Sequence, residues 1–200
     1  MTHAKNVCHR ETSPLTHLKD SIRRLKIAER EALSSDERLA KSEMISRHIM
    51  SLPEFKDART VMLYRGVKGE VRLDLLPLLA PGKRYAYPLC AEGGVMRALI
   101  PEGGDAFRPG PFGIPEPDPA RSEEVRPEEL DLVICPCTAF DGGHRRLGMG
   151  GGYYDRFLPK CTHATVIAAA FDCQRAEMLP EEAFDVRVDA VVTEEGLTSK

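Results

Sequence analysis

The chain has 200 residues, of which 42% are hydrophobic and 30% charged, and its formal net charge is -3. This length and composition suit one globular domain with a substantial core. The small net charge gives no field that would attract nucleic acid or an anionic membrane. We therefore expect a monomer that acts on small molecules, with no nucleic-acid or membrane partner.

The apolar residues are distributed without a membrane span or a signal-peptide core. No stretch approaches the roughly 20 apolar residues of a membrane helix, and residues 1–17 contain no long apolar run. A cytoplasmic protein is expected. The six cysteines form no CxxC pair, which predicts reduced thiols. Cys135 and Cys137 lie within the apolar run DLVICPCTAF, and there we expect small buried side chains rather than metal ligands.

Two helices are expected first along the chain. Leu18, Ile22 and Leu25 recur at helical spacing, and the segment SSDE provides Ser34 and Glu37 for a capping box at the start of a second helix. Residues 1–14 precede this pattern. They are expected to form a flexible extension, with a single domain over residues 15–200.

Strands dominate the rest of the sequence. Residues 101–127 hold seven of the fifteen prolines, which predicts an extended loop or edge covering rather than a helix. A short helix is expected in LDLLPLLA, and strands in TVMLYRG, RYAYPLC, VMRALI, DLVICPCTAF, ATVIAAAF and VDAVV. The run DLVICPCTAF is apolar enough for a central strand buried on both faces. This alternation predicts a three-layer α/β fold with a mostly parallel sheet.

The segment HRRLGMGGGYYDRFL, residues 144–158, follows the predicted central strand. Its four glycines, Gly148, Gly150, Gly151 and Gly152, would let backbone N–H groups approach an oxygen anion, and a helix beginning near Gly151 would add its positive end. The pattern matches neither a P-loop nor a dinucleotide fingerprint. A tight strand-to-helix connection without a ligand is therefore an equal alternative.

The charged neighbours of these glycines favour a ligand. Arg145 and Arg146 precede the loop and could make charge-assisted hydrogen bonds to phosphate oxygens. Asp155 follows it. A carboxylate beside phosphate is repulsive unless a cation lies between them, and Mg²⁺ commonly takes one or two carboxylates together with phosphate oxygens. The combination predicts a site for a magnesium nucleoside triphosphate. Alternatively, Asp155 only complements the positive end of the helix.

The sequence AFDGGHRRLGMGGGYYDRFL resembles the signature of the 5-formyltetrahydrofolate cyclo-ligase family. Four further segments occur in that family's order: LKDSIR, YRGVKGEVRLDLL, FGIPEP and FDCQRAEMLPEEAFDVRVDAVVTEEG. The resemblance implies an α/β fold like that of sugar-phosphate isomerases and CoA transferases. It also implies ATP- and Mg²⁺-dependent conversion of 5-formyltetrahydrofolate to 5,10-methenyltetrahydrofolate, with release of ADP and phosphate, through a phosphorylated formyl group.

Two alternatives share this fold: a non-catalytic protein that binds folate or nucleotide, and an enzyme that handles sugar phosphates or CoA. The resemblance also implies individual roles. Arg146 and Tyr153 would act in catalysis. Arg65, Glu70 and Tyr153 would bind the folate, and Asp155 and Asp189 would bind Mg²⁺. ATP would be held by Lys19, Arg23, Arg145, Arg146, Leu147, Gly148, Met149, Gly150, Gly151, Gly152, Tyr153 and Tyr154.

Several of these residues have a simpler interpretation. The basic residues of the first helix follow spacings of four, three and four, which without the resemblance predicts a solvated face: Lys19, Arg23, Lys26 and Arg30. Glu70 would then be a loop carboxylate and Asp189 an exposed residue of an alternating strand. The chain also departs from the family's usual pattern, with His144 where glycine is common and Met149 where a basic residue is common. Arg145 is a candidate to replace that missing charge.

Overall fold

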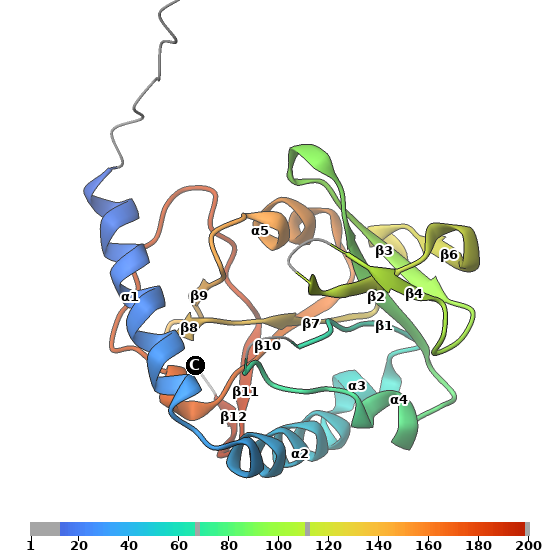
Figure 1. The fold of residues 1–200 in the computed structure, drawn as a ribbon, viewed down its shortest axis with the longest axis horizontal. Helices are drawn as coiled ribbons and strands as arrows, with labels where there is room; N and C mark the ends of the chain where they lie inside the picture. The colour runs from blue at the N-terminus through green and yellow to red at the C-terminus, as the bar shows by residue number, and fades with distance from the viewer. Residues whose placement is uncertain (1–12, 67–68, 111–112, 199–200) are drawn as a thin grey trace, which may run out of the picture.

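The computed structural model describes residues 13–66, 69–110 and 113–198, and within them two helices come first (Figure 1). Helix α1 spans Pro14–Glu31 and α2 spans Ser35–Ser51. The expected capping box is confirmed, because the Ser34 hydroxyl accepts from the Glu37 N–H and the Glu37 carboxylate accepts from the Ser34 N–H. Residues 1–12 of the expected extension lie outside the described residues. Its last two residues are ordered with α1, since Ser13 is the N-cap and Pro14 is the first helical residue.

An eight-stranded mixed sheet forms the centre of the fold, in the order β12-β11-β10-β7-β1-β2-β3-β6. The five strands from β11 to β2 are parallel, and β12, β3 and β6 pair antiparallel at the two edges. The strands are β1 (Thr60–Met62), β2 (Arg84–Cys90), β3 (Met96–Pro101), β6 (Ser122–Val125), β7 (Leu132–Pro136), β10 (Thr165–Ala169), β11 (Ala190–Thr193) and β12 (Gly196–Thr198). The expected mostly parallel α/β sheet is confirmed.

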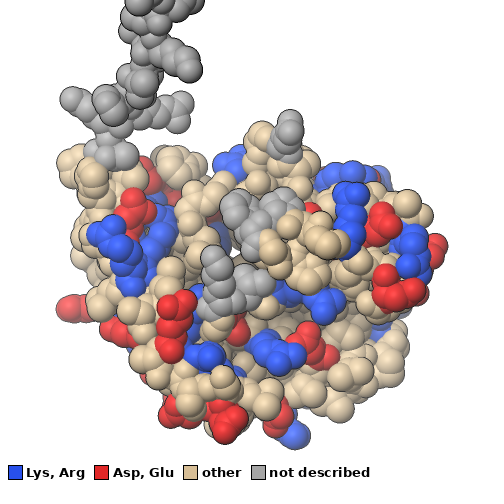
Figure 2. Space-filling model, viewed as in Figure 1, with Lys and Arg blue, Asp and Glu red and all other residues tan. Residues whose placement is uncertain are grey.

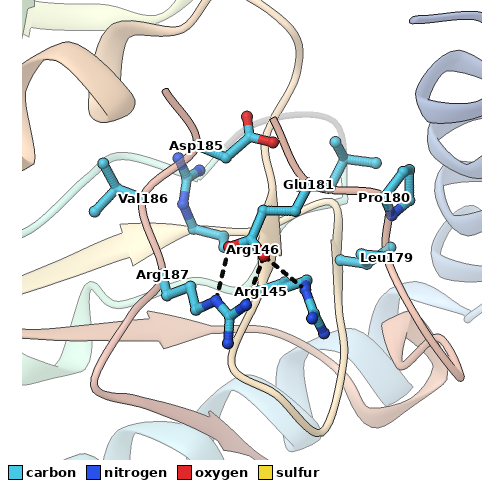
Figure 3. Close-up of a pocket in the computed structure, with 9 residues that line it drawn as sticks. Arg145, Arg146, Leu179, Pro180, Glu181, Asp185, Val186 and Arg187 are labelled. Carbon is cyan, nitrogen blue, oxygen red and sulfur yellow. Dashed lines mark hydrogen bonds and ion pairs between the residues drawn. The ribbon is translucent and has the colours of Figure 1, made fainter. Parts of the chain in front are cut away.

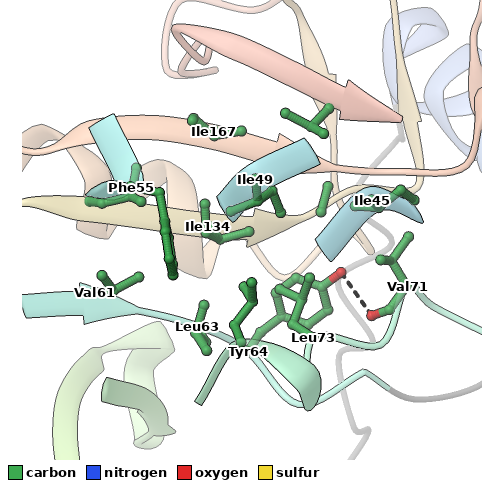
Figure 4. Packing of buried hydrophobic residues seen from close by; sticks show 14 of the residues in the cluster. Ile45, Ile49, Phe55, Val61, Leu63, Tyr64, Val71, Leu73, Ile134 and Ile167 are labelled. Carbon is green, nitrogen blue, oxygen red and sulfur yellow. Dashed lines mark hydrogen bonds between the residues drawn. The ribbon is translucent and has the colours of Figure 1, made fainter. Parts of the chain in front are cut away.

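Helices cover both faces of this sheet and complete three layers (Figure 1). One face carries α2, α3 (Pro53–Asp57) and α4 (Leu75–Leu79), and the other carries α5 (Tyr153–Phe157). On the first face, Ile45 and Ile49 of α2 pack over Ile134 and Ile167 of the central strands (Figure 4). None of the helices among the described residues is long and apolar enough to cross a membrane.

The proline-rich region contains no α-helix in its described part. It forms the small antiparallel pair β4 (Phe107–Pro109) and β5 (Pro115–Pro117) and then the edge strand β6, with single 3-10 turns between. Cys135 and Cys137 are buried as expected. Burial raises the pKa of Cys135 to about 11 and that of Cys137 to about 12, so both are neutral thiols at neutral pH.

Helix α1 is packed with its basic face inward. The leucines that predicted it point to solvent, with Leu18 51% and Leu25 56% exposed, whereas Lys19 is 4% and Arg30 1% exposed. Only Ile22 of the apolar set packs against a buried cluster. The expectation of a solvated basic face is therefore wrong. The cations of α1 face the protein because carboxylates and backbone carbonyl groups on its inward side pair with them.

We predict that apolar substitutions on α1 will differ according to this orientation. Leu25→Gln should change the free energy of unfolding by less than about 0.5 kcal/mol, because an exposed side chain loses little burial. Ile22→Gln should cost about 1 to 2 kcal/mol through lost apolar contact. Urea unfolding of the two variants gives the comparison. A larger loss for Leu25→Gln than for Ile22→Gln would contradict the observed orientation.

Candidate functional site

The glycine segment lies at the carboxyl ends of the central parallel strands. Before the glycines, β8 (Ala139–Phe140) and β9 (Arg146–Leu147) form a short antiparallel pair, and after them α5 begins. The Arg146 Nη1 donates to the carbonyl of Pro136, the last residue of β7, at 3.3 Å. Ligands of open α/β sheets commonly bind at this edge. The glycine segment therefore lies at the carboxyl edge of the sheet, as its place after the predicted central strand indicated.

Residues 148–152 are here called the glycine loop. Two of its carbonyl groups accept hydrogen bonds from arginines, whereas most of its N–H groups have no acceptor among the described residues. Gly150 and Gly152 have φ values of 98° and 64°, which side-chain-bearing residues rarely adopt. The Gly148 carbonyl accepts from the Arg23 Nε at 2.8 Å, and the Gly151 carbonyl accepts from the Arg156 Nη2 at 2.6 Å. In the described part of the chain, the N–H groups of residues 149–152 donate no hydrogen bond. They form an exposed set of donors suited to an anion.

The inward face of α1 supplies cations beside the glycine loop. Arg23 bonds to the loop through Gly148, as above. The Lys19 ammonium lies against Glu182 and Asp185, at 2.7 Å from the Glu182 carboxylate. Burial lowers the pKa of Lys19, but its hydrogen bonds to Asp185 and Glu182 outweigh burial and raise the pKa above its ordinary value. Lys19 therefore remains a cation, with carboxylates as its partners in this arrangement.

Asp141 connects the segment 179–187 to residues 143–145, which precede the glycine loop, through hydrogen bonds to both. This carboxylate is 1% exposed and accepts from the N–H groups of Leu179 at 2.8 Å and Gly143 at 2.9 Å. It also accepts from the N–H and Nη1 of Arg145, both at 3.1 Å. Burial raises the pKa of Asp141, but these hydrogen bonds lower it more strongly, so the group is ionised at neutral pH.

Arg145 and Arg146 face different partners. Glu181 lies between the guanidinium groups of Arg145 and Arg187, while the Arg146 side chain runs toward Asp185 (Figure 3). Arg145 is thus occupied by Asp141 and Glu181, which argues against its replacing the cation absent at Met149. Arg146 is buried, and its Nη2 bonds to Asp155 at 3.0 Å.

The two expected metal ligands are not brought together. The Asp189 carboxylate accepts from the Val166 N–H at 2.8 Å, near the start of β10 and toward the amino edge of the parallel strands. The carboxylate that lies with the glycine motif is Asp185, since it lines a small pocket with Arg145 and Arg146 and its neighbour Val186 places its N–H 3.5 Å from Asp155. No cluster of three or more metal-binding side chains occurs among the described residues.

A second set of polar residues surrounds Glu70. The Glu70 carboxylate is 3.9 Å from the guanidinium of Arg30, which is almost fully buried. Burial, and next the charge of Glu70, raise the pKa of Tyr64 well above its ordinary value. The Tyr154 hydroxyl is also buried and makes no hydrogen bond to a described residue. The Tyr154 ring, expected at the nucleotide, has its centroid 5.4 Å from the Arg146 guanidinium.

The remaining predicted residues occupy varied positions. Arg65 lies over the ring of Phe107, 4.4 Å from its centroid, and Leu147 is buried at 4% exposure in β9. The Tyr153 ring is 5.6 Å from the Arg156 guanidinium. Met149 is 58% exposed. His144 has φ of 59°, a left-handed conformation that glycine adopts more readily than residues with a side chain.

Sequence reasoning missed several residues that build the site. Asp141 and Arg156 stood inside the quoted motif, but their roles depend on segments far along the chain. The buried cation Arg30 was assigned to a solvated face. Gln174 was not considered, although its amide donates to the carbonyls of Cys137 at 2.6 Å and Thr138 at 3.0 Å. The spacing of Arg30 from Lys19, Arg23 and Lys26 on one face of α1 was the available signal.

Together, these observations define an α/β protein with a glycine-rich loop of unpaired backbone donors at the carboxyl edge of its sheet, within the described residues. A model of the 5-formyltetrahydrofolate cyclo-ligase family matches residues 16–194. The cyclo-ligase of Escherichia coli K12 is 32% identical over 172 residues, which cover 82% of this chain and 93% of that protein. The mouse cyclo-ligase is 26% identical over 187 residues, covering 84% and 89%.

Solved structures agree with these relatives. The NMR structure of Aquifex aeolicus 5,10-methenyltetrahydrofolate synthetase has a TM-score of 0.80 and 37% identity, covering 90% of this chain and 91% of that one. The synthetase of Mycoplasma pneumoniae has a TM-score of 0.72 at 24% identity, covering 88% and 98%, and supports the fold alone. The chain belongs to the 5-formyltetrahydrofolate cyclo-ligase family.

We predict that Asp141→Asn will loosen segment 179–187 and destabilise the protein by about 2 kcal/mol, because hydrogen bonds to a buried charge are lost. The folded pKa of Asp141 lies below its ordinary value of 3.8. The parent's extra stability is therefore present above that pH and is lost as pH falls through the folded pKa. The variant should lack this part of the acid-side decline in melting temperature.

Thermal melts between pH 3 and pH 7 provide the measurement. Asp105→Asn is the matched control, because Asp105 is exposed and pairs only with Arg121 at the surface. Its melting temperature at neutral pH should equal that of the parent. Equal melting temperatures for Asp141→Asn and the parent would contradict the role given to Asp141.

Proposed function

We propose that the glycine loop and α1 bind the triphosphate of ATP and that the Glu70 side of the site binds the folate. The protein is a 5-formyltetrahydrofolate cyclo-ligase by family, and this reaction is the ATP-dependent conversion of 5-formyltetrahydrofolate to 5,10-methenyltetrahydrofolate. The observation that carries the proposal is the row of N–H groups at residues 149–152 that donate to no described residue. Arg23 adds positive charge beside them, and Lys19 lies one turn earlier on the same helix.

The reaction needs a better leaving group than a formyl oxygen. We infer that this oxygen attacks the γ-phosphorus of ATP, the bond to the β,γ-bridging oxygen breaks, and ADP leaves. N10 then adds to the activated carbon, loses its proton, and phosphate departs with the former formyl oxygen. The protein contributes position and charge compensation, as in other phosphoryl transfers.

Arg146 is the residue best supported for charge compensation during transfer. Its guanidinium is buried between Asp155 and the Tyr154 ring, 5.4 Å from the ring centroid, and its Nε makes no hydrogen bond to a described residue. A preorganised buried cation stabilises developing negative charge strongly. We propose that Arg146 faces the transferred phosphoryl group and that Tyr153, at the start of α5, lies beside the folate.

The donor set fits one Mg²⁺ that takes its remaining oxygens from phosphate and water. We propose that Asp155 and Asp185 hold it. The Asp155 Oδ1 bonds to Arg146 and its Oδ2 has no hydrogen-bond partner in the described residues, so one oxygen is available. The bound metal would neutralise phosphate charge. Asp189 is replaced in this role because its carboxylate lies with Val166.

Glu70 is suited to recognise the pterin. A carboxylate can accept hydrogen bonds from an amino group and a ring N–H at once. Its partner Arg30 holds it from the protein side. The ring of Phe107, edge-on to Tyr87 at 5.3 Å between centroids, offers an aromatic surface near Arg65 in place of a tryptophan.

We predict that metal dependence will separate the three aspartates. Asp155→Asn and Asp185→Asn should each raise the Mg²⁺ concentration for half-maximal activity by at least about tenfold, a loss of 1.4 kcal/mol in binding. Asp189→Asn should change it by less than about twofold, because its carboxylate bonds to the backbone elsewhere. Activity is measured over a Mg²⁺ series at saturating ATP. A large shift in Asp189→Asn with none in Asp185→Asn would restore the assignment made from sequence.

The function itself is tested by incubation with 5-formyltetrahydrofolate, ATP and Mg²⁺ while methenyl absorbance is followed. We expect product to form at one ADP per methenyl group and to cease when a chelator is added. Tight folate or nucleotide binding without turnover would favour the non-catalytic alternative.

On the face shown in Figure 2, basic and acidic side chains are interspersed. The expected monomer, cytoplasmic location and absence of nucleic-acid and membrane partners stay predictions.

A further inference from the structure

We propose that Arg156 is a positioning residue that orients the glycine loop for nucleotide binding by tying it to the turn between β2 and β3. Its Nη2 donates to the Gly151 carbonyl at 2.6 Å and its Nε donates to the Gly94 carbonyl at 3.0 Å. One guanidinium thus joins two backbone segments that are 57 residues apart in sequence. This inference rests on the proposed binding of ATP at the glycine loop.

Peptide geometry gives this contact its effect. In a trans peptide unit the carbonyl and the following N–H point in opposite directions. Because the Gly151 carbonyl is directed at Arg156, the N–H of Gly152 is directed away from it. Arg23 acts in the same way at Gly148, and so directs the N–H of Met149. The two arginines therefore fix two carbonyl groups and two donor directions in one short loop.

The same contact removes a source of repulsion. A carbonyl oxygen carries partial negative charge and would oppose phosphate if it turned toward the nucleotide. A charge-assisted hydrogen bond to a guanidinium is roughly twice as strong as one between neutral groups, so it holds the carbonyl in place effectively. Arg156 contributes without contacting the nucleotide. Its role is to keep Gly151 in a single orientation.

The turn that receives Arg156 is built to allow it to approach closely. Gly94 has φ of 75°, and a Cβ at this position would overlap the Arg156 guanidinium. Gly93 has a similar φ of 71°, but a Cβ there would meet no atom within 4 Å. Alanine imposes the same kind of backbone strain at both positions. Only Gly94→Ala should displace Arg156, and it does so from outside the glycine loop.

The test measures binding of a non-hydrolysable ATP analogue with Mg²⁺ by calorimetry, together with the KM values for ATP and for 5-formyltetrahydrofolate. The variants are Arg156→Met, Arg156→Lys, Gly94→Ala and the control Gly93→Ala. We expect Arg156→Met and Gly94→Ala to weaken nucleotide binding by about fivefold to tenfold, with the folate KM changed by less than about twofold. Arg156→Lys should recover part of the loss, because an ammonium can still donate to one carbonyl.

Thermal melts separate this effect from simple loss of stability. Gly93→Ala and Gly94→Ala should lower the melting temperature by similar amounts, while nucleotide binding falls only in Gly94→Ala. Unchanged binding in Arg156→Met, or equal binding in the two glycine variants, would overturn the inference. If the parent protein binds no nucleotide, the proposed function fails instead, so the two failures are distinguishable.

Discussion

A buried carboxylate with four hydrogen bonds, Asp141, is the interaction on which the site depends. It joins the start of the glycine motif to segment 179–187, and that segment supplies Glu182 and Asp185 to Lys19. An ionised group with this many donors is stable only while each donor is in place. The position of α1, the carboxylates beside the glycine loop and the direction of Arg146 therefore all follow from one local arrangement.

Charge is balanced inside the site before any substrate enters. The cations Lys19, Arg30 and Arg146 are each buried beside a carboxylate, which lowers the cost of removing them from water. A polyphosphate would replace carboxylates as the partner of some of these cations. Exchange of one anionic partner for another requires less reorganisation than charging an apolar pocket, which suits the nucleotide binding that we propose for this site.

Local sequence patterns predicted most of the fold because they depend on neighbours in the chain. The capping box at Ser34, the apolar run of β7 and the prolines of 101–127 all act within a few residues. The orientation of α1 could not be predicted this way, since its leucines and its basic residues both recur at helical spacing. The partners that decide between the two faces lie far along the chain, for example 163 residues away for Lys19 and 125 for Arg23.

The separation of Asp155 from Asp189 could not be read from the sequence for a related reason. Asp185 and Asp189 are four residues apart in FDVRVDAVV, and the pattern does not show where strand β11 begins. Because β11 starts at Ala190, Asp189 bonds to the neighbouring strand and Asp185 remains in the preceding segment near Arg146. The glycines and Arg146 lie at the sheet edge, where the clear apolar strand before them indicated, and their roles stay predictions.

The inward basic face of α1 also has a consequence for how the chain is made. The Lys19 ammonium pairs with residues 163 and 166 positions further along, so α1 lacks these partners until almost the whole chain has left the ribosome. The central strands can pair before then, because domains fold as their segments emerge. Helix α1 therefore gains the ion pairs of Lys19 only after the central strands have been synthesised.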